Sequence, residues 1–287
     1  NSVGIVLSPS VVSLGEAKIT LNNPLKLSGD NTIGLQLTNT TLDMSNSVIK
    51  FIIGDAPNAA DSTGNASGNS ADKVDGAIGM ALASATRAVI MDDYDIFLGN
   101  YSKSGVGIIV QNGNLTLSNN GKNNKIVSDG GEGNILIAAD GANSVITIGN
   151  NTDLELRNGI GQVGLFARNG GKITNNSTLT ATGDGTIGVI LNGTAATSIV
   201  NTGDININGG VYTDSSNNRI GSVGIAAIGS GANFTSTANN VKINVTGIES
   251  TGLFADTGKI ELENGDIKTG DGAFNLYSKN ATGLIKL

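Results

Sequence analysis

The 287-residue chain contains no cysteine and no histidine, carries a formal net charge of −7, and draws only 3% of its residues from the aromatic types. The missing thiols and imidazoles exclude disulfides, thiolate metal sites and hydrolases built on a His-containing triad. The acidic balance argues against nucleic acid as a partner, because binding to phosphates needs clustered Lys and Arg. We therefore expect no cofactor and no bound metal.

A short phrase of apolar residues around a glycine recurs along the whole chain. The central residues of its copies, eight of them glycines, are Gly4, Gly34, Gly79, Gly107, Asn134, Gly164, Gly188, Gly224, Gly252 and Ala273. The spacing averages about 30 residues, which is typical of a repeat architecture.

Within each copy, the residues at −1, +1 and +3 from the central residue are nearly always apolar, as in Ile187, Val189 and Leu191. This alternation predicts a strand with one buried face. A second alternating run follows each phrase after a turn, and several units carry a third. Two or three short strands per unit, without helical periodicity, predict an all-β coil, or β-solenoid, of about ten turns.

Asn-Gly pairs at 112–113, 158–159, 169–170, 192–193 and 264–265 predict the corners of this coil. Glycine-rich stretches at 159–164 and 183–188 match a dinucleotide-binding pattern, but a strand phrase follows each instead of a helix, which favours corner turns.

Two stretches interrupt the repeat, at residues 55–75 and 211–220. We expect both to be loop insertions that project from a single β-helix domain spanning residues 1–287, since a stacked coil accommodates extra residues only at its corners.

The stretches 164–192 and 252–272 resemble the repeat of the passenger domains of Gram-negative autotransporter (type V secretion) adhesins. In both, an aliphatic-Gly phrase precedes a Gly-Lys-Ile strand and an Asn-containing turn. The resemblance implies a right-handed parallel β-helix on the cell surface, anchored to the outer membrane through a region not in this chain. It also implies attachment to host cells or other bacteria. We expect a binding and display role toward a surface protein or glycan, without enzymatic activity. We accordingly expect a segment of a longer passenger that does not itself insert into a membrane.

The residues at +2 from the central position form a predicted outer apolar stripe beside the column of central glycines, which we also expect on the outer face. The stripe comprises Val6, Ala81, Ile109, Leu136, Phe166, Ile190, Ala226 and Phe254. One interpretation is that an insertion or neighbouring segment covers it. The other is that it binds a partner or a second copy, with Phe166 and Phe254 as the main contacts.

The insertion at 211–220 supplies further candidate binding residues, Tyr212, Asp214 and Arg219. Loops on a rigid scaffold commonly carry recognition, although a spacer role would leave these residues without a partner.

The densest acidic spot comprises Asp92, Asp93 and Asp95, of which the last two share one face of a predicted strand. Paired carboxylates support catalysis in β-helix polysaccharide lyases and hydrolases, which form the alternative functional class. Such enzymes also need basic groups nearby, and only Arg87 is close in sequence. A solvated acidic patch is therefore the favoured interpretation.

Overall fold

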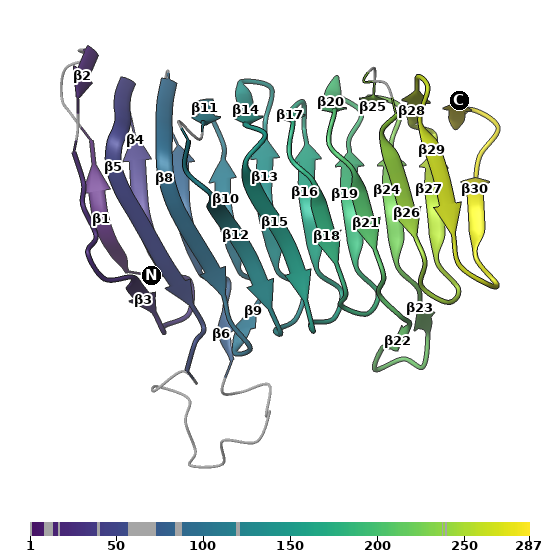
Figure 1. The fold of residues 1–287 in the computed structure, drawn as a ribbon, viewed down its shortest axis with the longest axis horizontal. Coiled ribbons are helices and arrows are strands. Elements are labelled where there is room, and N and C mark those ends of the chain that lie inside the picture. The colour runs from purple at the N-terminus through teal and green to yellow at the C-terminus, as the bar shows by residue number, and fades with distance from the viewer. Residues whose placement is uncertain are drawn as a thin grey trace.

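The computed structural model describes residues 2–8, 14–16, 18–38, 41–56, 73–83, 88–118, 121–236, 238 and 240–287. Within these ranges all regular structure is β-strand. The strands stack into three parallel sheets, here called A, B and C, that form the walls of one elongated solenoid (Figure 1). The predicted all-β parallel coil is therefore confirmed.

Sheet A contains ten parallel strands, one from each successive repeat phrase. They are β1 (Val3–Leu7), β4 (Ile33–Thr38), β7 (Ile78–Ala83), β10 (Val106–Val110), β13 (Ile135–Asp140), β16 (Val163–Arg168), β19 (Ile187–Asn192), β24 (Val223–Ile228), β27 (Thr251–Asp256) and β30 (Phe274–Ser278).

Sheets B and C share two long strands, β5 (Thr41–Ile53) and β8 (Ala88–Leu98), each of which serves both walls. Elsewhere separate strands serve each wall. Sheet B continues with β2 (Leu14–Glu16), β11 (Gly113–Leu117), β14 (Ser144–Ile148), β17 (Lys172–Asn175), β20 (Thr197–Asn201), β25 (Ala232–Ser236), β28 (Lys259–Leu262) and β31 (Leu284–Lys286). Sheet C continues with β3 (Leu25–Leu27), β12 (Asn124–Asp129), β15 (Thr152–Arg157), β18 (Leu179–Ala181), β21 (Ile205–Ile207), β26 (Lys242–Val245) and β29 (Asp266–Thr269).

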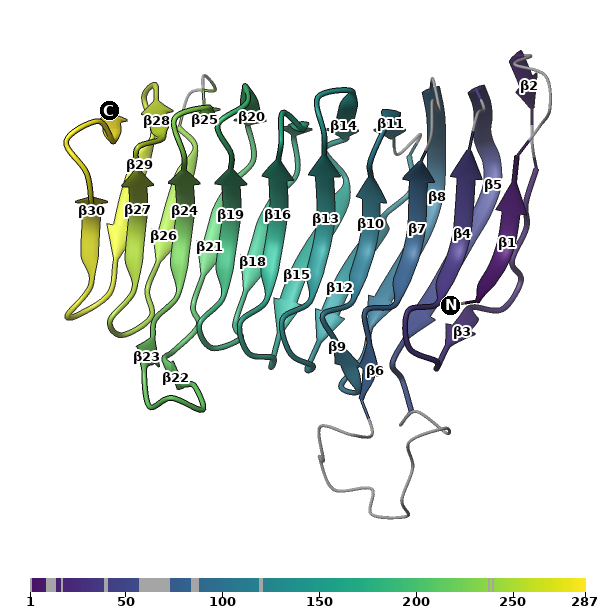
Figure 2. The ribbon, with the colours of Figure 1, turned by 180° about the vertical axis from the view of Figure 1, so that it is seen from behind.

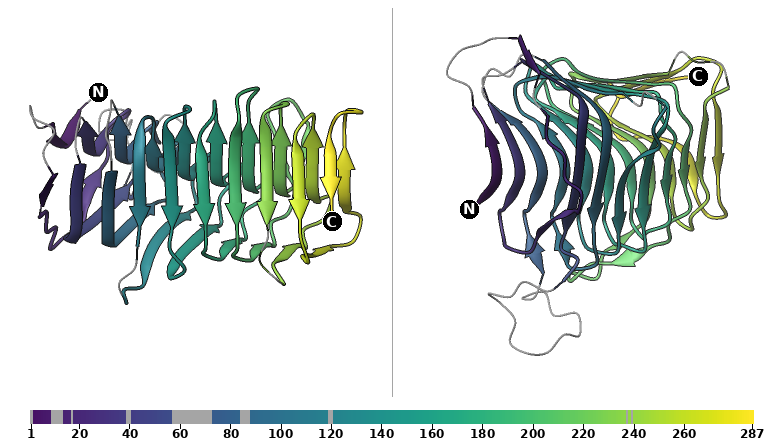
Figure 3. Two further views of the ribbon diagram at one scale, coloured as in Figure 1. Left: turned by 90° about the horizontal axis from the view of Figure 1, so that it is seen from above. Right: turned by 60° about the vertical axis from the view of Figure 1, so that its left-hand side comes forward.

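The coil is right-handed, as the resemblance implied. In Figure 1 the chain rises through sheet A at the back and descends through sheet C at the front while it advances from left to right. The oblique view in Figure 3 shows successive turns stacked in one direction.

A single hydrophobic cluster fills the space between the three walls. Its largest fully buried side chains include Tyr94, Phe51 and Phe234, and the remainder are mainly Leu, Ile and Met. The +1 and +3 residues of the phrase, such as Leu165 and Ala167, are completely buried, as the alternation predicted. Each turn adds one thin apolar layer to the core, which explains how a chain so poor in aromatic residues folds.

The central glycine of the phrase points into the core, so the prediction that it belongs to the outer face is wrong. A Cβ on Gly188 would lie 2.7 Å from the carbonyl oxygen of Gly224 and 2.8 Å from Cδ1 of Ile207. The next residue, Val189, is also fully buried, so the strand places two consecutive residues inward. The −1 residue, Ile187, is consequently half-buried on the outer side instead of lying in the core.

The predicted corners are formed by left-handed backbone. Asn158, Asn169 and Asn264 have φ values of 50°, 53° and 57°. At the other two pairs the glycines adopt positive φ instead, at Gly113 and Gly193. Asn and Gly tolerate this conformation at low cost, which explains their frequency in the connectors.

The insertion predicted at 55–75 begins and ends at the lower edge of Figure 1. Residues 57–72 lie outside the described residues. The prediction is wrong at its C-terminal end, because Val74 is fully buried and forms β6 (Val74–Asp75). This strand pairs in parallel with β9 (Ser102–Lys103) as a small additional sheet.

The insertion at 211–220 is an antiparallel hairpin. It consists of β22 (Tyr212–Thr213) and β23 (Arg219–Ile220), with Tyr212 opposite Ile220 and Thr213 opposite Arg219. The hairpin also emerges at the lower edge of the solenoid (Figure 1).

Candidate functional site

The outer face of sheet A carries two ladders of predominantly apolar side chains, joined strand to strand by the parallel register. The outer column consists of Val6, Gln36, Ala81, Ile109, Ala138, Phe166, Ile190, Ala226, Phe254 and Tyr277. The flanking column, at the −1 position, consists of Val3, Ile33, Ile78, Val106, Ile135, Val163, Ile187, Val223, Thr251 and Phe274. Two consecutive inward residues separate the columns in every strand.

Leu136 does not belong to the outer stripe in which it was predicted. Strand β13 pairs Ile137 with Ile108, so Leu136 lies opposite Gly107 and is completely buried. The outward residue of this turn is Ala138. The sequence pattern centred this weaker copy on Asn134 instead of Leu136, two residues too early, because the copy has no central glycine.

The last copy of the phrase was likewise centred two residues too early, on Ala273 instead of Asn275, so Tyr277 was left out of the predicted stripe. Tyr277 pairs with Phe254 in the outer column, and their rings stack with centroids 5.6 Å apart. Phe274 of the flanking column lies 6.2 Å from Tyr277. The phrase Phe-Asn-Leu-Tyr-Ser aligns with Thr-Gly-Leu-Phe-Ala once Asn is allowed in place of Gly, so the sequence did contain this signal.

Both predicted aromatic contacts, Phe166 and Phe254, lie on this outer face and are half-buried. Side chains of the adjacent strands cover much of the surface of these two rings, because adjacent parallel strands stand about 4.8 Å apart. In Figure 2 sheet A is nearest the viewer, and no described strand crosses in front of it. The interpretation that a neighbouring segment covers the stripe finds no support among the described residues.

A polar border runs beside the outer column. The Arg168 guanidinium carbon lies 5.6 Å from the centroid of the Phe166 ring, and the same group donates a 2.7 Å hydrogen bond to Asp140. Burial by itself would raise the pKa of Asp140, but hydrogen bonds from Arg168 and Asn169 outweigh it and lower the pKa. Asp140 therefore stays ionised and holds Arg168 over the aromatic ring.

In the hairpin, Tyr212 packs against the solenoid instead of projecting from it. A Cβ on Gly185 would lie 2.2 Å from Cδ1 of Tyr212, and one on Gly161 would lie 3.4 Å from its hydroxyl oxygen. Both glycines belong to the G-x-G-x-x-G stretches, and both have positive φ. These stretches form corner turns, and their missing side chains make room for the Tyr212 ring.

The other two predicted binding residues of the hairpin stabilise its shape. The Asp214 carboxylate accepts hydrogen bonds from the backbone N–H groups of Ser216 and Asn218, and the bonds to Asn218 lower its pKa. Arg219 forms a bidentate pair with Glu249 at 3.0 and 2.7 Å. The hairpin is thus fastened to the adjacent turn, and its predicted contact residues have local roles.

The acidic residues lie on β8, where Asp93 and Asp95 share the outer face as predicted. Asp92 is buried and accepts a hydrogen bond from the Ser118 hydroxyl. Stacking brings Lys122 to 3.6 Å from Asp93 and Lys50 to 3.9 Å from Asp95. The expectation that basic groups are scarce here is therefore wrong. Arg87, the basic residue nearest in sequence, lies outside the described residues.

The Asp95 side chain lines a shallow cavity of ≈ 320 Å³ that extends across three turns of sheet C. Its lining comprises Asn22, Pro24, Lys50, Phe51, Ile52, Asp95, Ile96, Phe97, Lys125 and Val127. Burial raises the pKa of Asp95, while the charges of Lys50 and Lys125 oppose this effect. A carboxylate between two lysines beside an apolar floor can receive a polar ligand.

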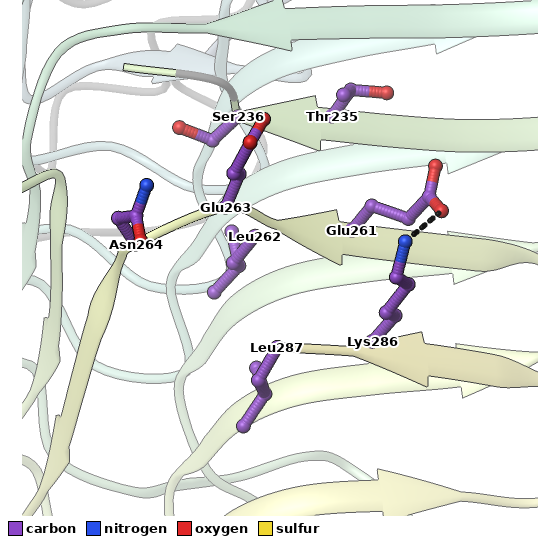
Figure 4. A pocket seen from close by; sticks show the side chains of 8 residues that line it. All are labelled: Thr235, Ser236, Glu261, Leu262, Glu263, Asn264, Lys286 and Leu287. Atoms are coloured by element: carbon purple, nitrogen blue, oxygen red, sulfur yellow. Dashed lines mark ion pairs between the residues drawn. The ribbon is translucent and has the colours of Figure 1, made fainter. Parts of the chain in front are cut away.

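A cavity of ≈ 400 Å³ lies near the C-terminal end of sheet B (Figure 4). Its lining comprises Thr235, Ser236, Glu261, Leu262, Glu263, Asn264, Lys286 and Leu287. Glu261 pairs with Lys259 at 2.8 Å and with Lys286 at 3.7 Å, and the hydrogen bond from Lys259 lowers its pKa. The charge of Glu261 is therefore neutralised within the wall itself.

Tyr94, between the two outward aspartates, makes stability depend on pH. Its side chain is fully buried with its hydroxyl 2.6 Å from Thr152 Oγ1, and burial raises its pKa from 10.0 to about 12. Between these values only the unfolded state loses the proton, so stability falls as pH rises. We expect unfolding in urea to show a loss of about 2 kcal/mol from pH 9.5 to 12 that Tyr94→Phe lacks. Identical pH profiles for the two proteins would contradict this.

Comparison of the chain with known protein families, with curated proteins and with solved structures gives no match in any of the three. No group of three or more metal-ligating side chains occurs among the described residues. That part of the chain likewise has no helix with the length and apolar character needed to span a bilayer.

Proposed function

We propose that this chain is a surface-exposed segment of a bacterial autotransporter adhesin and attaches to host cells or other bacteria through the outer face of sheet A. The observation that carries the proposal is the pair of apolar columns, which runs across all ten strands of the sheet. A solvent-facing sheet surface normally carries polar side chains, and extended apolar patches mark interaction sites. The repeat resemblance supports secretion to the cell surface and anchoring through a part of the protein beyond this chain.

The rigid coil suits such a role because binding groups on it keep fixed positions. Phe166 and Phe254 are aromatic anchors held by backbone ladders on both sides, and Tyr277 stacks on Phe254 from the terminal strand β30. Aromatic side chains contribute large contact areas at a small cost in conformational entropy. The partner class that fits is a surface protein with an apolar patch, or a glycan whose C–H faces stack on the rings.

The double variant Phe166→Asp/Phe254→Asp tests the proposal. We expect the labelled protein to lose at least about tenfold in attachment to cultured host cells and to bacteria, because two carboxylates would be desolvated in the contact. Val200→Asp is the matched control, since Val200 is an exposed apolar residue on sheet B, 37% exposed. Unchanged attachment by a folded double variant would refute sheet A as the contact surface.

The cavity around Asp95 favours a second function, as a polysaccharide lyase or hydrolase. Lys50 and Lys125 supply the basic groups that such chemistry needs beside a carboxylate, and Phe97 lines the same cavity. Turnover of acidic polysaccharides, with and without calcium, that disappears in Asp95→Asn would establish this activity. Absence of turnover across the panel would leave the cavity as a part of the scaffold.

A further inference from the structure

We propose that the outer face of sheet A binds a second copy of this chain face to face. The two copies are related by a two-fold axis that runs parallel to the strands and lies between their Phe166 side chains. This inference rests on the proposed function, because it names the partner of the same surface.

The sizes of the side chains along the outer column carry the argument. From the third strand to the tenth, the three alanines are separated by one or two larger residues, in the order Ala81, Ile109, Ala138, Phe166, Ile190, Ala226, Phe254 and Tyr277. The three alanines are only 3–4% exposed because larger neighbours flank each of them. The face is therefore rippled, with a shallow dip at each alanine.

A two-fold axis parallel to the strands preserves the position along each strand and reverses the order of the turns. The outer column of one copy then faces the outer column of the other. With the axis at Phe166, every alanine faces a larger residue. The facing pairs are Ala81 with Phe254, Ile109 with Ala226, Ala138 with Ile190, Phe166 with itself, and Gln36 with Tyr277.

Neighbouring registers fit less well. Moving the axis by half a strand spacing places Ala138 opposite Ala226 in one direction and Ala81 opposite Ala226 in the other, which leaves voids in the contact. Moving it by a full strand to Ile190 keeps Ala138 and Ala226 opposite phenylalanines, but it leaves Ala81 beyond the end of the facing sheet and brings Asp140 opposite Asp256 at the polar border. With the axis at Phe166, Asp140 instead faces Asn192, and no carboxylate of this border faces another.

The border of the Phe166-centred pairing is compatible with close approach. The two copies of Arg168 meet near the axis, but each is paired with its own Asp140 at 2.7 Å and retains 47% side-chain exposure. The flanking columns add Val163 facing itself and Ile135 facing Ile187.

The area is sufficient for a specific dimer. Nine strands at about 4.8 Å each and five residues of strand length give about 700 Å² per copy. The resulting total of about 1,400 Å² falls within the range of standard interfaces. Facing sheets pack about 10 Å apart, which is the depth that one large and one small side chain fill together at the three alanine pairs.

Because the chain has no cysteine, single-cysteine variants test the register without background. A maleimide crosslinker that spans about 8 Å should join two Phe166→Cys chains, whose cysteines face each other across the axis. It should leave Ile190→Cys uncrosslinked, since those positions lie two strands apart. Crosslinking of Ile190→Cys but not Phe166→Cys would overturn the proposed axis, and crosslinking of neither would overturn the face-to-face contact.

Sedimentation equilibrium of the unmodified protein provides the second measurement. We expect a concentration-dependent dimer. Phe166→Asp should raise its dissociation constant on the order of a hundredfold, while Val200→Asp should leave this constant unchanged. A protein that sediments as a monomer even at its highest soluble concentration would overturn self-association. If that monomer still attaches to host cells, the proposed function stands and only its partner is wrong.

Discussion

Leu136→Ala is expected to destabilise the protein by about 3 kcal/mol, although the repeat pattern placed this residue on the surface. Leu136 is fully buried and fills the inward position that glycine takes in neighbouring turns. Truncation removes apolar contacts and leaves a cavity among rigid ladders that cannot collapse around it. Denaturant unfolding followed by circular dichroism measures the change.

Phe166→Ala is the matched comparison, because Phe166 lies outward one strand away. We expect it to cost less than about 1 kcal/mol, since a half-buried outer side chain leaves no internal cavity. Equal losses for the two variants would show that both residues occupy the same kind of environment, contrary to the inward placement of Leu136.

Asn201→Leu is expected to cost about 3 kcal/mol through its hydrogen bonds. The Asn201 side chain is fully buried, accepts a 2.7 Å hydrogen bond from Asn175 Nδ2 and donates one of 2.6 Å to the Gly203 carbonyl. Leucine has a similar volume but can neither accept nor donate. The Gly203 carbonyl would lose the donor that now satisfies it in a dry interior.

A second asparagine pair supplies the control. Asn244 Nδ2 donates a 2.7 Å hydrogen bond to Asn206 Oδ1 on the outer side of sheet C, where both residues are half-buried. Asn206→Leu should cost less than about 1 kcal/mol, because water can replace the lost partner. A larger loss for Asn206→Leu than for Asn201→Leu would contradict the role assigned to burial.

The sequence could predict the coil because its signals are local and repeated. The apolar +1 and +3 residues, such as Val189 and Leu191, are buried in turn after turn, and Asn158, Asn169 and Asn264 mark corners as their type suggests. It could not show that Gly188 faces inward. A glycine has no side chain to reveal its side of a strand, and the period-two rule does not allow two consecutive inward residues.

The candidate site was predictable only where it depends on one strand. Phe166 and Phe254 were placed on the outer face correctly, since the alternation of apolar residues within their own strands determines which face they occupy. The approach of Lys50 to Asp95, and of Tyr212 to Gly185, depends on which turns stack at which register. Residues far apart in sequence become neighbours there through loop lengths that no local pattern specifies.

The hydrogen bonds that join successive strands of sheet A run along the long axis of the solenoid, from Val3 opposite Ile33 to Thr251 opposite Phe274. Tension applied between the two ends therefore pulls each bond along its own direction and loads the terminal strands first. The turns would detach one after another, each releasing about 100 Å of extended chain. Under shear from flowing liquid, such a molecule lengthens in steps while the remaining turns stay folded.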